Sequence, residues 1–146
     1  MRIAVGTDHA GFEGDPQYKL AMVEHLRAQG HEVVDCGSFD AAAVDYPDVA
    51  ERVCAAIQGG EAECGVVLCG TGIGMSIAAN RHAGIRAAVC ATAEMVQLSR
   101  LHNNANVLCL GRRVLSLAAC LEYLDLWLGT SFSGEERHAR RVAKVH

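Results

Sequence analysis

One of the seven cysteines in this chain stands where chemistry is easiest to support. Cys69 ends the apolar run 64–69 and directly precedes the glycine-rich turn 70–74, which leads into a helix-like segment. Glycines let the backbone approach a ligand, and a helix start directs unpaired N–H groups and a positive partial charge toward it. The same dipole favours a thiolate, which could act as a nucleophile or as a base that removes a proton from carbon. The turn could also be a tight connection that binds nothing.

The glycine spacing of this turn excludes two common nucleotide-binding motifs. Gly70, Gly72 and Gly74 form G-x-G-x-G after the third expected strand, whereas the dinucleotide fingerprint is G-x-G-x-x-G. A P-loop needs Gly-Lys-Ser or Gly-Lys-Thr, which this sequence does not contain. The ligands that such a turn could hold are a phosphate, a carboxylate or a developing oxyanion.

Two pairs of polar side chains adjoin expected strands. Asp8-His9 directly follow the run 2–7, and His102-Asn103 end a helix-like segment just before the run 106–110. Each pair could bind a ligand or move a proton, since ligands in parallel α/β folds bind beside strand ends. Each could instead be structural, with Asp8 acting as a cap beside an exposed histidine.

Basic side chains follow the run 106–110 and gather again near residue 140. Arg113 belongs to the first group, while Arg137 and Arg141 are four residues apart and would share one face of a helix. Two guanidinium groups on one face could grip a phosphate through charge-assisted hydrogen bonds. This basic segment could also be only a solvated face.

Composition and charge exclude several other classes of protein. The net charge of −4 disfavours a dedicated nucleic-acid binder, which carries a basic face. The apolar run that reaches Leu128 contains Glu122 and Asp125, and the first apolar stretch is too short for a signal peptide, so we expect a cytoplasmic protein without a membrane span. The cysteines show no Cys-x-x-Cys and no Cys/His zinc spacing, which predicts reduced thiols and no metal site.

The elements that must position these side chains alternate strictly along the chain. Half of the 146 residues (51%) are apolar, which is enough to bury a core. We expect strands over 2–7, 32–36, 64–69, 86–91 and 106–110, and helices over 16–29, 47–58, 73–81, 92–101, 114–128 and 134–144. This order predicts one α/β domain over residues 1–146, a three-layer Rossmann-like fold with a five-stranded parallel sheet and a C-terminal helical arm.

Five separated blocks of the sequence, in the same order, resemble the type B ribose-5-phosphate isomerase and galactose-6-phosphate isomerase family. The most specific block is 69–88, which begins Cys-Gly-Thr-Gly-Ile-Gly-Met-Ser, and the others are 7–12, 45–47, 99–108 and 137–141. The resemblance covers essentially the whole chain. Some members use a glutamate a few residues after the cysteine position, and since residue 75 is Met, this chain resembles the cysteine type.

The resemblance implies an enzyme that interconverts aldose and ketose phosphates, usually ribose 5-phosphate and ribulose 5-phosphate, without a metal or another cofactor. Cys69 is then the base that moves the proton between C2 and C1 through an enediolate, His102 opens the furanose ring, and Thr71 helps to stabilise the enediolate. The substrate-binding residues implied are Gly70, Gly72, Ile73 and Gly74 at the enediolate, Asp8 and Asn103 at sugar hydroxyls, and His9, Arg113, Arg137 and Arg141 at the phosphate. The chemistry agrees, because removing a weakly acidic C2 proton needs a placed base and stabilisation of the adjacent oxygen.

Members of this family form homodimers, sometimes homotetramers, with active sites shared between subunits, so we expect a sugar phosphate and further copies of the chain as partners.

Two segments depart from the family pattern, Glu13-Gly14-Asp15-Pro16 before the first helix and Glu135-Glu136 before the arm. Either could change how the far end of the sugar is held. The alternatives are an isomerase of allose 6-phosphate, galactose 6-phosphate or a tetrose phosphate, and a non-catalytic nucleotide-binding module.

Overall fold

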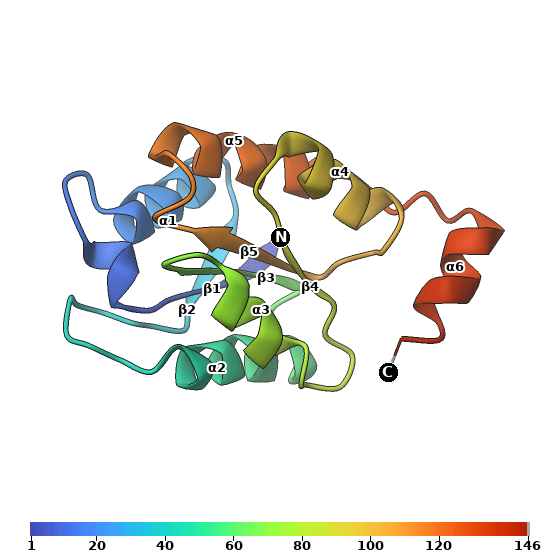
Figure 1. The fold of residues 1–146 in the computed structure, drawn as a ribbon, viewed down its shortest axis with the longest axis horizontal. Helices are drawn as coiled ribbons and strands as arrows, with labels where there is room; N and C mark the ends of the chain where they lie inside the picture. Colours follow the sequence, from blue (N-terminus) through green and yellow to red (C-terminus); the bar gives the residue numbers. More distant parts are fainter. Residues whose placement is uncertain (146) are drawn as a thin grey trace.

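Five parallel strands form the central sheet. The computed structural model describes residues 1–145, in which the strands lie in the order β2-β1-β3-β5-β4 (Figure 1). The strands are β1 (Arg2–Thr7), β2 (Glu32–Asp35), β3 (Cys64–Cys69), β4 (Ala87–Val89) and β5 (Val107–Gly111). All four neighbouring pairs run parallel. The predicted Rossmann-like α/β fold is therefore confirmed.

Helices cover both faces of this sheet. On one face lie α1 (Tyr18–Ala28), α4 (Ala93–Leu101) and α5 (Leu117–Leu128), and on the other lie α2 (Tyr46–Gln58) and α3 (Ile73–Ala79) (Figure 1). Alternate residues of β3 show how one strand serves two cores, because successive side chains point to opposite faces. Val66 and Leu68 pack into the first core, and Val67 and Cys69 into the second.

The bounds of β3 match the prediction because burial on both faces leaves a continuous apolar run. All six residues Cys64–Cys69 are buried, and β5 beside it is buried throughout. The register pairs Cys69 with Gly111, so the ends of β3 and β5 lie together. The backbone that carries Cys69 is thus fixed by neighbours on both sides.

The start of α5 differs from the prediction, which placed it at Val114. The N–H groups of Val114 and Leu115 instead donate to the Gly111 carbonyl in a tight turn. The helix begins only after Ser116, whose hydroxyl accepts the Ala119 N–H at 3.1 Å. A serine cap therefore sets this boundary, although the apolar pattern extends past it.

The predicted C-terminal helical arm is present as α6 (Glu136–Val142). Figure 1 shows it standing apart from the layers, on the side away from the tip of the β5 arrow. Within residues 1–145, none of the helices has the length and apolar character needed to cross a membrane.

Candidate functional site

The end of β1 places Asp8 and His9 beside the sheet. The Asp8 carboxylate accepts the Ala10 N–H at 2.9 Å and so caps a short 3-10 helix, η1 (His9–Phe12). The His9 ring accepts the Val44 N–H at Nδ1, at 3.4 Å. Because a neutral imidazole that accepts at Nδ1 carries its proton on Nε2, His9 has an N–H donor left for a ligand. Asp8 is thus both a cap and a predicted ligand, two roles that the sequence left as alternatives.

Cys69 is held by the turn that follows it. The Cys69 thiol is buried, and its Sγ accepts the Gly72 N–H at 3.1 Å. The Ile73 N–H donates to the Thr71 hydroxyl at 3.3 Å. These two hydrogen bonds hold the sulfur and the turn after it in a fixed relation.

Two glycines make this turn possible. Gly72 has φ +81°, a left-handed conformation, and a Cβ there would lie 3.0 Å from the backbone of Leu110. A Cβ on Gly111 would lie 2.6 Å from the carbonyl oxygen of Thr71. The turn after β3 and the end of β5 therefore touch through backbone atoms, and side chains at these positions would push them apart.

Three of the other cysteines are held as neutral thiols. Burial raises the pKa of the Cys54, Cys64 and Cys120 thiols to about 11. The Cys54 thiol donates toward the Ala79 carbonyl at 3.8 Å, which favours the protonated form. These thiols remain protonated at neutral pH, and they pack as small apolar side chains.

One cavity of about 280 Å³ joins most of the predicted residues at the ends of β1 and β3. Its lining consists of Asp8, His9, Ala10, Tyr46, Cys69, Gly70, Thr71, Gly74 and Arg113. We call it the Cys69 cavity. Tyr46 had no predicted role, although it belongs to a block that resembles the family. Its ring covers Gly74 so closely that a Cβ there would lie 2.7 Å from it.

Arg113 brings positive charge to the Cys69 cavity. Its backbone N–H donates to the Gly70 carbonyl at 2.8 Å, and its guanidinium lies over Gly70, 2.9 Å from where a Cβ would be. The same guanidinium contacts the Glu13 carboxylate at 3.4 Å. Segment 13–16, which departs from the family pattern, therefore contacts Arg113, a residue predicted to bind the phosphate.

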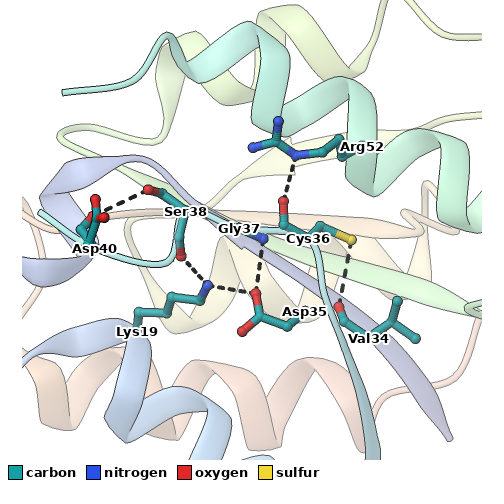
Figure 2. A network of polar contacts seen from close by, with 8 residues as sticks. All are labelled: Lys19, Val34, Asp35, Cys36, Gly37, Ser38, Asp40 and Arg52. Atoms are coloured by element: carbon teal, nitrogen blue, oxygen red, sulfur yellow. Dashed lines mark hydrogen bonds and ion pairs between the residues drawn. The ribbon is translucent and has the colours of Figure 1, made fainter. Parts of the chain in front are cut away.

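A buried lysine fixes the loop after β2 that reaches this cavity. Lys19 of α1 donates to the Asp35 carboxylate at 2.6 Å and to the Ser38 carbonyl (Figure 2). Arg52 of α2 donates to the Cys36 carbonyl at 2.8 Å from the other side (Figure 2). The loop continues to Val44, whose N–H orients His9. This network therefore supports the Cys69 cavity indirectly, through the loop and His9.

Two more predicted residues, Gly72 and Ile73, belong to the turn after Cys69 but do not line the cavity. The other four predicted residues lie elsewhere. His102, Asn103 and Arg141 line a second cavity of about 620 Å³, together with His138, and we call it the arm cavity. Arg137 is exposed, lines neither cavity and pairs with Glu135 at 3.1 Å. His102 and Asn103 precede β5, and residues that precede a parallel strand lie at the opposite end of the strands from residues that follow one, such as Arg113. Arg137 and Arg141 belong to the arm, α6. Within one chain, the structure does not bring these residues to Cys69.

Within residues 1–145, no group of three or more His, Cys, Asp or Glu side chains is arranged to hold a metal ion. The polar groups of the Cys69 cavity are N–H donors, the Cys69 thiol and the Asp8 carboxylate, together with two hydroxyls (Tyr46 and Thr71), the His9 imidazole and the Arg113 guanidinium. The fold and this cavity define a class of protein, an α/β protein equipped to move a proton at the carbon of an anionic substrate.

The chain belongs to the ribose/galactose isomerase family, whose pattern it matches over residues 3–145. It is 45% identical to ribose-5-phosphate isomerase B of Escherichia coli over 144 residues, which covers 99% of this chain and 93% of that protein. The solved structure of Clostridium thermocellum ribose-5-phosphate isomerase B has a TM-score of 0.93 at 46% identity, covering 99% of this chain and 95% of that one. The Thermotoga maritima ribose 5-phosphate isomerase has a TM-score of 0.92 at 45% identity, with coverage of 99% and 96%.

Proposed function

We propose that this protein interconverts ribose 5-phosphate and ribulose 5-phosphate. The observation that carries the proposal is the Cys69 sulfur, which accepts an N–H bond at 3.1 Å in a cavity that also holds Asp8, His9 and Arg113. Relatives over the full length of the chain bear the name ribose-5-phosphate isomerase B. We also expect it to act as a single domain in the cytoplasm, without a metal or another cofactor.

In the proposed reaction, Cys69 carries one proton between two carbons. The thiolate takes the proton from C2 of the open-chain aldose, the C2–H electron pair forms the C1–C2 double bond, and O1 becomes an enediolate oxygen. Thr71 and the N–H groups of Gly70 and Gly74 stabilise this negative charge, and the Ile73 N–H joins them by giving up its 3.3 Å bond to the Thr71 hydroxyl. The O2 proton then passes to O1, and the thiol returns its proton to C1 while the O2 electron pair forms the ketose carbonyl.

The phosphate binds at the cationic end of the Cys69 cavity. His9 donates from Nε2, since its Nδ1 is occupied by the Val44 N–H. Arg113 donates from its guanidinium, releasing the 3.4 Å contact with Glu13. Asp8 accepts hydrogen bonds from sugar hydroxyls between this end and Cys69.

A second copy of the chain completes the site. His102 and Asn103 lie at the opposite end of the strands from Cys69, and Arg137 and Arg141 lie on the arm. These four residues therefore reach a Cys69 cavity from a neighbouring subunit. His102 of that subunit opens the furanose ring, Asn103 binds a hydroxyl, and the two arginines bind the phosphate. The assembly that this requires is a homodimer, or a homotetramer built from such dimers.

The test is an NMR assay of proton exchange at C1 and C2 in deuterated buffer with a chelator present. Ribose 5-phosphate, allose 6-phosphate, galactose 6-phosphate and erythrose 4-phosphate are compared at equal concentration. We expect the fastest exchange with ribose 5-phosphate. Faster exchange with another sugar phosphate would change the substrate, and nucleotide binding without any exchange would contradict the isomerase proposal.

A further inference from the structure

The arm rests on the body through one buried side chain. Within α6, His138 is buried, whereas Arg137 and Arg141 are exposed. The ion pair of Arg137 is to Glu135, inside the arm itself. How α6 sits on the body therefore depends on what the His138 ring touches.

The His138 ring stacks on His102. The ring centroids are 4.2 Å apart and the planes differ by 14°. His102 ends α4 and is half-buried, and the Nε2 atom of His138 is buried without a hydrogen-bond partner among residues 1–145. A neutral imidazole packs well on another ring or on a cation, but two charged rings at this distance repel each other.

We propose that His138 is a positioning residue. It holds the His102 ring in the orientation needed for ring opening, and it holds the arm against the body of the protein. This inference rests on the proposed function, in which His102 opens the furanose ring. While His102 exchanges a proton with the sugar, the neutral His138 ring keeps it in place and stabilises its transient charge. The same contact holds Arg141 beside both histidines, in the lining of the arm cavity.

Burial first, and then the surrounding groups, disfavour protonation of His138. Burial, followed by the nearby His102, lowers the pKa of His138 below its ordinary value. The charged groups around the pair are Glu135, Arg137 and Arg141 from the arm and Arg86 from the body. Only Glu135 favours protonation. When the pH falls through the lowered pKa, His138 gains a charge in a buried position, and the arm should then leave the body, with a loss of activity.

The experiment compares His138→Ala, which removes the ring, with His138→Phe, which keeps a flat ring that cannot take a proton. His82→Ala is the control, since His82 lines neither the Cys69 cavity nor the arm cavity. For each protein, kcat and KM are measured from about pH 5 to about pH 8.5. Ribose 5-phosphate serves as the cyclic substrate and ribulose 5-phosphate as the open-chain one. Mass is checked by light scattering.

We expect His138→Ala to lower kcat on the cyclic aldose by about 10- to 100-fold, the effect of displacing a catalytic group by about 1 Å. The loss on the open-chain ketose should be smaller. His138→Phe should keep kcat near the wild-type value at alkaline pH, and its acid limb should move to lower pH. His82→Ala should match the wild type throughout.

Wild-type kcat and KM in an intact His138→Ala enzyme would overturn the proposal. If the alanine variant fails to fold, an unshifted acid limb in His138→Phe would overturn it alone. An NMR titration of the His102 ring separates this proposal from the proposed function, because it needs no turnover. A wild type without isomerase activity would refute the function, whereas an unchanged His102 ring signal in His138→Ala would refute the stack.

Discussion

The Cys69 cavity and the arm cavity are built in opposite ways. Around Cys69, buried strands and glycines in backbone contact fix the cysteine and the turn after it, since a Cβ on Gly72 or Gly111 would collide with its neighbour. In the arm cavity, Arg141 projects from a helix whose one buried residue is His138. In the proposed function, proton transfer at carbon falls to this constrained backbone, whereas ring opening and part of the phosphate binding fall to residues that a neighbouring subunit supplies.

Cys69→Ala should have the largest effect of any single change in the constrained half. We expect kcat to fall by about 10⁴-fold, the upper end of what a positioned base contributes, while substrate binding stays largely intact. The measurements are proton exchange at C2 and calorimetric binding of ribose 5-phosphate. Cys36→Ala is the control, because this cysteine lies outside the cavity. Near-wild-type turnover of Cys69→Ala would show that another group is the base.

On the arm, the double variant Arg137→Ala/Arg141→Ala should cost about 10²- to 10⁴-fold in kcat/KM on ribose 5-phosphate. Each guanidinium offers a charge-assisted fork to the phosphate, so the loss should nearly vanish on ribose. Arg140→Ala is the matched control on the same helix, where Arg140 pairs with Glu136 at 3.6 Å. Equal relative losses on both sugars would leave the arm only a structural role.

His102→Asn should sharpen the comparison, since ring opening concerns only the cyclic substrate. We expect a loss about 10- to 100-fold larger on ribose 5-phosphate than on ribulose 5-phosphate. Single-turnover kinetics are required, because the equilibrium constant links the two directions. Equal losses in both directions would remove His102 from ring opening.

Metal removal should have the smallest effect. In the proposed reaction, N–H donors of the turn after Cys69 stabilise the enediolate, so exhaustive chelation should leave the isomerisation rate unchanged. The rate is measured before and after dialysis against a chelator. A loss that one divalent metal restores would contradict this account of the Cys69 cavity.

The two halves also differ in how far the sequence predicts them. The bounds of β3 and the Cys69 turn follow from an apolar run and glycine spacing, which are local signals. The separation of His102 from Cys69 depends on which end of the strands each residue lies at. That follows only from the register and order of the strands. The burial of Lys19 between Asp35 and Ser38 has no local signal at all, because a lysine in a helix usually faces solvent.

The central claim is that the two halves act as one site across a subunit interface, and mixing two inactive variants tests it most directly. Cys69→Ala and His102→Asn are denatured together in equal amounts, refolded and assayed on ribose 5-phosphate, with each variant refolded alone as the control. In a mixed dimer, one of the two sites joins an intact Cys69 to an intact His102. Random pairing should therefore restore about a quarter of wild-type activity. Activity no higher than that of the separate variants, in a mixture shown by mass to contain mixed dimers, would contradict the shared site.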